Sequence, residues 1–200
     1  MLTEKEKMLE GLPYQANDPV LVRDRNLAKT MVFEFNSLHP DRSEDGKALL
    51  RKLFGATKNN FHIEQSIRID YGYNIYLGEN FYANYNLVIL DCAAVTIGDN
   101  VMLAPNVGIY TAGHPIHHEP RNAGFEYAFP INIGNNVWVG ANVIINPGVS
   151  IGDNTVIGSG SVVTRSIPAN VVAVGNPCRV IKEITEGDRD FYFGKMKFPV

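Results

Sequence analysis

The sequence has few cysteines, no excess of positive charge and no long hydrophobic run. Cys92 and Cys178 are two thiols in 200 residues, too few for a disulfide framework and compatible with a reducing compartment. Lysine and arginine number 18 against 21 aspartates and glutamates, so no basic surface predicts nucleic-acid binding. No stretch of about 18 apolar residues predicts a membrane span or a signal peptide. We therefore expect a soluble, cytoplasmic protein that binds neither nucleic acid nor membrane.

Residues 1–58 differ in pattern from the rest of the chain. They are rich in charge, with Leu and Met at helical spacing, and we expect a helical N-terminal region. Apolar residues from Leu27 to Phe35 would line faces of one helix. The His-Pro pair at 39–40 should interrupt it, and Ser43 would cap a second helix. A chain of this length supports one domain with appendages.

A six-residue repeat dominates the middle of the chain. From about Ile63 an aliphatic residue recurs mostly every sixth position, often followed by glycine or another small residue. The clearest series is Ile133-Gly134, Val139-Gly140, Ile145-Asn146, Ile151-Gly152 and Ile157-Gly158. A sandwich of hairpins would alternate with period two, whereas period six is typical of a parallel β-helix. We expect a mainly β fold, with the β-helix over residues 59–184 and a C-terminal tail over 185–200.

The repeat is interrupted at three places. Ile69 to Leu77 and Ile89 to Ile97 each span eight positions, so two extra residues should bulge from a corner of each coil. The third break is longer, and it predicts a projecting loop over residues 115–132 without secondary structure of its own. Such loops are usually functional or disordered. Three of the five histidines lie at this break.

His114 stands where the loop leaves the β-helix, followed by Pro115. An imidazole titrates near neutral pH, so a histidine fixed on a rigid element can act as a general base; from the residues alone, a surface role is an equal alternative. His117 and His118 do not suggest a metal site, because adjacent side chains diverge and zinc needs converging ligands. Cys92 has no neighbour that would lower its pKa, which favours a packed thiol over a nucleophile.

Two features could serve a larger ligand. Trp138 lies between inward-facing valines, so its indole should face outward, against a neighbouring subunit or a ligand. Arg165, Arg179 and Lys182 lie where the repeat dissolves. They fit a solvated end-cap or a phosphate-binding group equally well.

The chain closely resembles the maltose and galactoside O-acetyltransferases among the hexapeptide-repeat acyltransferases. The resemblance covers nearly the whole chain, through YQANDPVLVRDR, YGYNIYLGENFYANYN, TAGHPIHHEPRN and VVAVGNPCRVIKEI. It implies a left-handed parallel β-helix, a homotrimer with active sites between subunits, and acetyl-CoA as co-substrate with no metal required. YGYNIYLG and IYTAGHPI are nearer the maltose type.

The resemblance also implies roles for single residues. His114 matches the catalytic histidine, and Asn84 its polar partner, which contacts the acceptor and helps stabilise the transition state. The remaining acceptor-side positions are Asp18, Arg25, Asp70, Tyr82, Asp91, Cys92 and Glu126. Cys92 and Glu126 depart from the galactoside type. The coenzyme A channel is implied for Trp138, Ala141, Ser159, Thr164, Arg165, Arg179 and Lys182.

The expected reaction is transfer of an acetyl group to a hydroxyl of a maltose-, glucose- or galactoside-class sugar. His114 would take the hydroxyl proton during direct attack, and the backbone N–H of Ala141 is a candidate donor to the oxyanion. Two rival hypotheses are a zinc carbonic anhydrase on the same fold, which needs histidines from different coils, and a non-catalytic assembly protein, which gives His114 no task.

Overall fold

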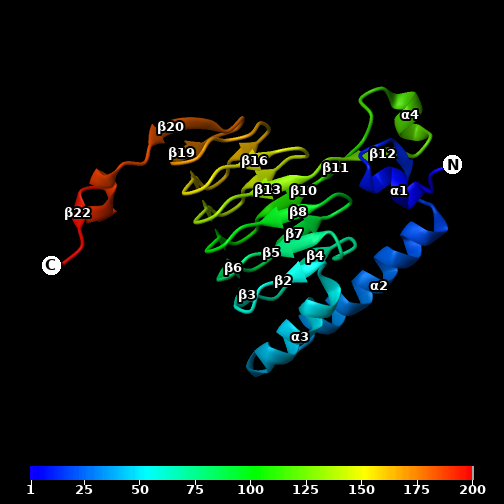
Figure 1. Cartoon of the computed structure of the whole chain (residues 1–200), viewed down its shortest axis with the longest axis horizontal. Helices are drawn as coiled ribbons and strands as arrows, with labels where there is room; N and C mark the ends of the chain where they lie inside the picture. Colours follow the sequence, from blue (N-terminus) through cyan, green and yellow to red (C-terminus); the bar gives the residue numbers. More distant parts are fainter. Residues whose placement is uncertain (200) are drawn as a thin grey trace.

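The computed structural model describes residues 1–199, and its N-terminal region is helical (Figure 1). This region contains α1 (Glu4–Leu9), the short strand β1 (Tyr14–Gln15), α2 (Pro19–Asn36), the 3-10 helix η1 (Pro40–Arg42) and α3 (Ser43–Leu53). The expected Ser43 cap is wrong. Ser43 is the first residue of α3, and Arg42 at the cap position makes no side-chain cap bond, because η1 runs directly into the helix.

Helix α2 packs one side against the rest of the protein and leaves the other exposed. Phe35 is 5% exposed, whereas Leu27 and Phe33 are 64% and 73% exposed. The apolar residues from Leu27 to Phe35 all lie in this one helix, as expected, but only some of them face the core. The buried side lies on α3 and on the first coils of the β-helix.

The rest of the fold is a parallel β-helix of three sheets, as the six-residue repeat predicts. We name each sheet by one strand. The β6 sheet contains β3 (Phe61–Ile63), β6 (Phe81–Ala83), β9 (Met102–Leu103), β14 (Trp138–Val139), β17 (Val156–Ile157), β19 (Val171–Val174) and β20 (Arg179–Glu183), the last antiparallel to β19. The β7 sheet contains β4 (Ile67–Ile69), β7 (Leu87–Leu90), β10 (Gly108–Tyr110), β15 (Ile144–Ile145) and β18 (Val162–Val163). The β8 sheet contains β2 (Ala56–Thr57), β5 (Ile75–Leu77), β8 (Val95–Ile97), β13 (Ile131–Ile133) and β16 (Ser150–Ile151).

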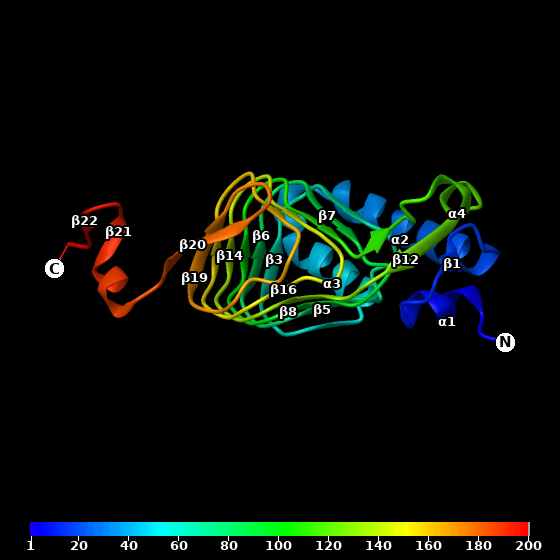
Figure 2. The same cartoon turned by 90° about the horizontal axis from the view of Figure 1, so that it is seen from above.

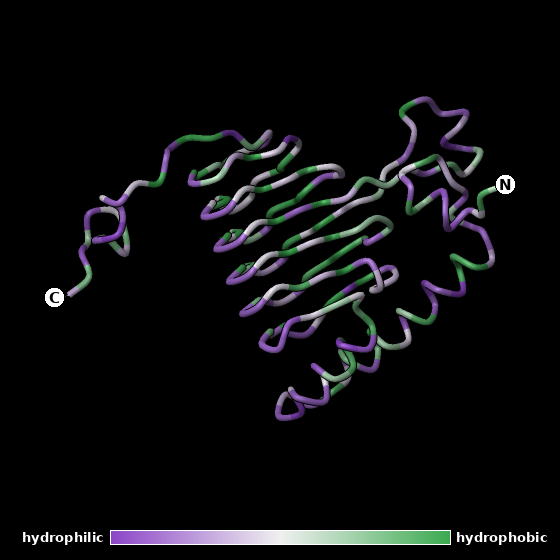
Figure 3. The backbone as a smooth tube through the Cα atoms, viewed as in Figure 1, coloured by the Kyte–Doolittle hydropathy of each residue, from purple (hydrophilic) through white to green (hydrophobic). Residues whose placement is uncertain are grey.

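The repeat residues form the core of the β-helix. Ile89, Ile109 and Ile145 stand in register on adjacent strands and are each at most 1% exposed. Hydrophobic residues recur at the same place in successive coils (Figure 3). Each such side chain contributes about 1.5–3 kcal/mol when fully buried, so the repeat itself supplies the stability of the scaffold.

The corners are held by side-chain ladders. At one corner, Asn80, Asn100, Asn136 and Asn154 all adopt the left-handed backbone conformation that asparagine tolerates. Each donates its side-chain amide N–H to the carbonyl oxygen of the asparagine one coil further along. The extra residues of the two eight-residue spacings lie at a different corner from this asparagine ladder. There, residues 70–74 of one coil stack on residues 91–94 of the next.

The projecting loop is where the sequence predicts it, but it has secondary structure. It contains α4 (His118–Asn122) and β12 (Phe125–Ala128), and β12 pairs antiparallel with β1 and with β11 (Ala112–Gly113), which leads into the loop. The expectation of an irregular loop is therefore wrong. Backbone hydrogen bonds between segments more than 100 residues apart give this loop its order.

The C-terminal tail lies on the opposite side of the β-helix from the projecting loop (Figure 2). It contains the 3-10 helix η2 (Glu186–Asp190) and the hairpin strands β21 (Phe191–Phe193) and β22 (Met196–Lys197). The division of the chain at residues 58 and 184 stays a prediction, and β2 already pairs with β5 from Ala56. Within residues 1–199, no helix is long and apolar enough to cross a bilayer.

Candidate functional site

Most of the candidate residues lie at two corners of the β-helix, one at each end of the β7 sheet strands. The Asn84 corner, which precedes these strands, comprises residues 64–66, 84–86, 104–106, 140–142 and 158–160. The His114 corner, which follows them, comprises residues 70, 91–92, 111–114 and 164–165. Because the strands are parallel and in register, each corner forms one continuous edge along the β-helix.

His114 follows β11 and faces a carboxylate. Its Nε2 atom is 3.9 Å from Oε1 of Glu126, and the side chains are 57% and 22% exposed. The other carboxylate oxygen of Glu126 accepts a 2.8 Å hydrogen bond from the hydroxyl of Tyr14, a residue that is fully buried. Glu126 is thus fixed beside an accessible imidazole.

A second group of side chains lies beside this pair. Arg25, on α2, donates to the hydroxyl of Tyr71 at 2.6 Å and to the carbonyl oxygen of Ala16 at 2.7 Å. Asp70 accepts a weak 3.7 Å hydrogen bond from the thiol of Cys92. Burial raises the pKa of Asp70, although the positive charge of Arg25 opposes the shift. Arg25, Asp70, Cys92 and Glu126, four of the candidate acceptor-side residues, are therefore brought together at the His114 corner.

Cys92 is a packed thiol. It is 3% exposed, and burial raises the pKa of its thiol to about 12. A thiol in this state stays protonated near neutral pH and is a poor nucleophile. The burial of Cys92 agrees with the expectation that its thiol is packed.

Asp91 holds the backbone of the preceding coil at the same corner. Its side chain is fully buried and accepts hydrogen bonds from the backbone N–H groups of Tyr71 and Gly72, at 2.8 and 2.7 Å. Burial raises the pKa of its carboxyl group to about 7, against the effect of these donors. The geometry gives Asp91 a supporting position beneath Asp70 and Tyr71, without exposed surface for an acceptor.

Asn84 belongs to the other corner, and Tyr82 lies just before it on β6. The side-chain oxygen of Asn84 accepts a 2.8 Å hydrogen bond from the backbone N–H of Tyr85. Within residues 1–199 its side-chain N–H₂ group has no hydrogen-bond partner, so it remains available as a donor. Tyr82 stacks on His62, with ring centroids 5.7 Å apart and an interplanar angle of 7°.

Within one chain, the structure does not bring Asn84 to His114. Strand β7 has 4 residues and, at about 3.3 Å per residue, separates the two corners by roughly 13 Å. The two residues that the family resemblance pairs in catalysis therefore lie at opposite edges of the same sheet.

The candidate coenzyme A residues are divided in the same way. Ala141 and Ser159 stack at the Asn84 corner, where the backbone N–H of Ala141 donates to the Ser159 hydroxyl oxygen at 3.1 Å. This N–H already has a partner, so serving as an oxyanion donor would require it to exchange that bond. Thr164 and Arg165 are exposed at the His114 corner.

The other three coenzyme A candidates lie on the β6 sheet. Trp138 faces outward and is 51% exposed, as its position between two valines predicts. Arg179 and Lys182 are exposed on β20. Lys182 forms an ion pair with Asp188 of the tail, whereas the guanidinium of Arg179 donates to the carbonyl oxygen of Cys178 at 2.8 Å.

Asp18 has a structural task. It is the N-cap of α2, and its carboxylate accepts hydrogen bonds from the backbone N–H groups of Val20 and Leu21. Sequence reasoning missed Tyr14 and Tyr71, which hold Glu126 and Arg25, because their contacts join residues 112 and 46 positions apart. In the part of the chain that the structure describes, no three His, Cys, Asp or Glu side chains are grouped as a metal site would need.

Known proteins are similar to this chain over nearly its whole length. Residues 7–58 match the maltose acetyltransferase hexapeptide capping motif, and residues 130–165 match the bacterial transferase hexapeptide model of six repeats. The galactoside O-acetyltransferase of Escherichia coli (strain K12) is 51% identical, over 95% of this chain and 89% of its own. The chain belongs to the maltose and galactoside O-acetyltransferase family.

Solved structures of this acetyltransferase family have the same fold. A maltose O-acetyltransferase from Clostridium difficile 630 is 58% identical, with a TM-score of 0.90 over 92% of this chain and 99% of its own. A galactoside acetyltransferase in complex with coenzyme A is 48% identical, with a TM-score of 0.96 over the whole of both chains. Membership in the family makes this chain an acetyltransferase built on the hexapeptide-repeat β-helix.

Proposed function

We propose that the protein transfers the acetyl group of acetyl-CoA to a hydroxyl of a maltose-, glucose- or galactoside-class sugar, with His114 as general base. The observation that carries the proposal is the accessible imidazole of His114 beside the fixed carboxylate of Glu126. The names of the relatives, among them a galactoside O-acetyltransferase and a galactoside acetyltransferase in complex with coenzyme A, support the donor and the acceptor class.

In this mechanism His114 accepts the proton of the sugar hydroxyl as its oxygen attacks the thioester carbonyl carbon. The carbon–sulfur bond then breaks, and His114 returns the proton to the departing thiolate. Glu126 stabilises the imidazolium that forms between these steps. The side-chain N–H₂ group of Asn84 donates to the acceptor or to the developing oxyanion. No acyl-enzyme forms, consistent with the raised pKa of the Cys92 thiol.

The complete site would combine the His114 corner of one copy with the Asn84 corner of the next. The two sheets that meet at the Asn84 corner present apolar side chains outward, among them Met102, Trp138, Val88 and Ile144. The outward residues of the β8 sheet are more polar: Tyr76, Thr96, Asn132 and Ser150. Contiguous apolar patches on a protein surface mark interaction sites, and a heterologous contact between different faces forms a ring when its rotation closes. We propose a homotrimer, as in the family resemblance.

On the donor side, Ala141 and Ser159 would line the acetyl end of the channel, and Trp138 would lie beside it. Thr164 and Arg165 come from the other corner, so this channel too would lie between copies. Arg179 and Lys182 would bind phosphate groups of coenzyme A. Tyr82, Asp70 and Arg25 would contact the acceptor. The free buried thiols support a cytoplasmic location, in a reducing compartment.

The test is an acetyl-transfer assay with the purified protein. Free thiol release from acetyl-CoA is followed with maltose, glucose and galactosides, and product masses identify the acetylated sugar. The proposal predicts release that depends on the sugar and a product heavier by one acetyl group. Release that is independent of every sugar, or none at all, would contradict the proposal.

A further inference from the structure

The Asn84 corner continues past Asn84 into the first coil of the β-helix. The backbone N–H of Glu64 donates to the carbonyl oxygen of Ala83 at 2.9 Å, and the hydroxyl of Ser66 donates to the side-chain oxygen of Asn86 at 3.2 Å. The proposed donor residues Ala141 and Ser159 lie on the other side of Asn84 along the same edge. Residues 64–66 therefore stand where an acceptor would extend away from the reacting hydroxyl.

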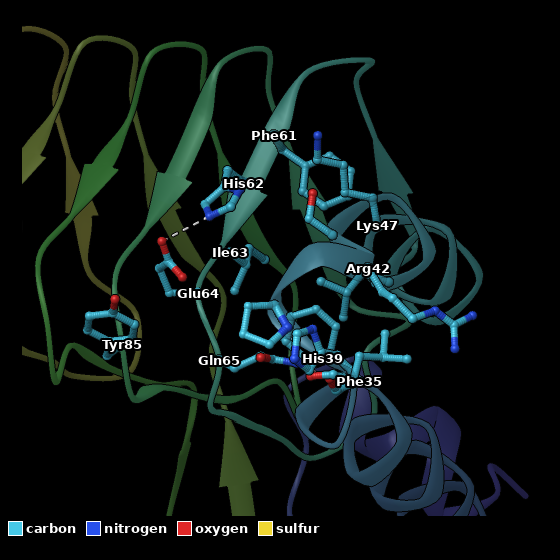
Figure 4. A pocket seen from close by; sticks show the side chains of 15 residues that line it. Phe35, His39, Arg42, Lys47, Phe61, His62, Ile63, Glu64, Gln65 and Tyr85 are labelled. Atoms are coloured by element: carbon cyan, nitrogen blue, oxygen red, sulfur yellow. Dashed lines mark hydrogen bonds and ion pairs between the residues drawn. The ribbon is translucent and has the colours of Figure 1, made fainter.

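A cavity of about 210 Å³ opens at this end of the corner, between the β-helix and the helical region (Figure 4). His62, Glu64 and Tyr85 line its β-helix side, and Phe35 and Leu50 form part of an apolar floor. We call this cavity the lower pocket. Sites for whole drug-sized ligands occupy roughly 300–1,000 Å³, so the lower pocket has room for one part of a ligand.

The charges around the lower pocket favour a neutral ligand. Arg42 and Lys47 lie on its helical side, but Arg42 donates to Asp45 at 2.7 Å and Lys47 to Glu44 at 2.7 Å. His62 is 3.1 Å from the carboxylate of Glu64. The basic groups are thus balanced by acidic ones, which excludes the concentration of positive charge that a phosphate would require.

The exposed surface of the lower pocket has the chemistry that a sugar ring requires. The Tyr85 side chain is 53% exposed, and His62 forms a flat aromatic stack with Tyr82. Aromatic faces pack against apolar C–H groups, while the carboxylate of Glu64 and the imidazole of His62 can accept from and donate to hydroxyl groups. Glu64 and Tyr85 also lie near enough to Tyr82 to help burial raise its pKa. The lower pocket is therefore continuous with a proposed acceptor residue.

We propose that the lower pocket binds a second sugar ring joined to the ring that is acetylated, so that the enzyme selects disaccharides or longer glycosides. The inference rests on the proposed function and deepens it. Tyr85 packs against the second ring, and Glu64 accepts a hydrogen bond from one of its hydroxyls. An apolar group attached to the sugar is the competing occupant, because the pocket floor is apolar.

The test compares maltose, glucose and heptyl glucoside as acceptors for Tyr85→Ala, Glu64→Gln and the wild type. Tyr76→Ala is the matched control, since Tyr76 is a 39% exposed tyrosine on the β8 sheet. We expect Tyr85→Ala to raise the KM for maltose about tenfold and Glu64→Gln to raise it about threefold, as for the loss of one aromatic contact and one hydrogen bond. The KM for glucose should change by less than about twofold, because a single sugar ring does not occupy the lower pocket.

Equal changes for maltose and glucose, or no change with either, would overturn the role of the lower pocket while leaving acetyl transfer intact. A rise in KM for heptyl glucoside with Tyr85→Ala, without an effect of Glu64→Gln on maltose, would assign the pocket to an apolar group and also overturn the inference. If the wild type releases thiol with none of the sugars, the proposed function itself fails, and the pocket's role falls with it.

Discussion

Nε2 of His114 and Oε1 of Glu126 lie 3.9 Å apart, and a buried tyrosine hydroxyl fixes the same carboxylate from the other side. The distance is beyond a hydrogen bond but within the range of charge stabilisation. The carboxylate therefore faces the imidazole without a direct hydrogen bond and leaves the ring accessible.

This pair predicts that Glu126→Gln lowers kcat by about tenfold, because a nearby negative charge no longer stabilises the imidazolium. Glu119→Gln is the matched control, since Glu119 lies 3.9 Å from Nδ1 of His117. A kcat for Glu126→Gln equal to that of the wild type would contradict a charge effect on the base.

The division of the site between two corners predicts complementation between inactive variants. His114→Ala and Asn84→Ala should each be impaired alone, but co-expression should restore roughly one quarter of the sites, from random pairing of copies in a cyclic assembly. His114→Ala mixed with the double variant His114→Ala/Asn84→Ala should recover no activity. If both variants co-assemble and the first mixture still recovers no activity, His114 of one copy and Asn84 of the next do not form one active site.

The position of Arg179 on exposed β20 predicts an effect confined to the donor. Arg179→Ala should raise the KM for acetyl-CoA by roughly tenfold, as expected for loss of a charged phosphate contact, with little change in the KM for the sugar. Arg189→Ala, which removes an exposed arginine from η2, is the control. Steady-state kinetics with each substrate varied would distinguish the two KM values. Equal increases in both would be evidence against a phosphate contact.

The buried carboxyl group of Asp91 predicts a dependence of stability on pH. Its pKa rises from the ordinary value to about 7 on folding. The stability that this group contributes is therefore fully present below about pH 4 and is lost as pH rises towards 7. Relative to Asp91→Asn, the free energy of unfolding of the wild type should fall by roughly 2–3 kcal/mol between pH 5 and pH 7.

Urea unfolding, followed by the fluorescence of Trp138, measures this difference at each pH. Asp70→Asn provides a second comparison, because Asp70 is a less buried carboxyl group at the same corner. A stability difference that rises with pH would mean instead that the backbone N–H groups of Tyr71 and Gly72 hold Asp91 in its charged form.

The sequence was sufficient to predict the β-helix because each coil repeats one physical requirement. Ile133, Val139 and Ile145 recur at spacing six and are all buried, so the period alone identifies the architecture. The break after Ile109 likewise predicted where the loop leaves the β-helix. The coils and the exit of the loop depend only on the spacing of residues close together in the sequence.

The candidate site was less predictable because its contacts are long-range. No spacing links Tyr14 to Glu126 or orders the projecting loop, since both depend on β12 pairing with β1. Asp91 resembled an acceptor residue, yet its carboxylate binds the backbone of the preceding coil. A corner with two extra residues needs an internal acceptor for its N–H groups, and only the folded chain places Asp91 there.

The most direct test of the central claim is the rate of thiol release by His114→Ala, with maltose or another accepted sugar at saturation. A general base contributes about 10²–10⁴-fold to the rate. We therefore predict a fall in kcat of at least about a hundredfold, with the KM for acetyl-CoA little changed. A variant that folds and assembles normally and retains the wild-type kcat would contradict the assignment of His114 as the base.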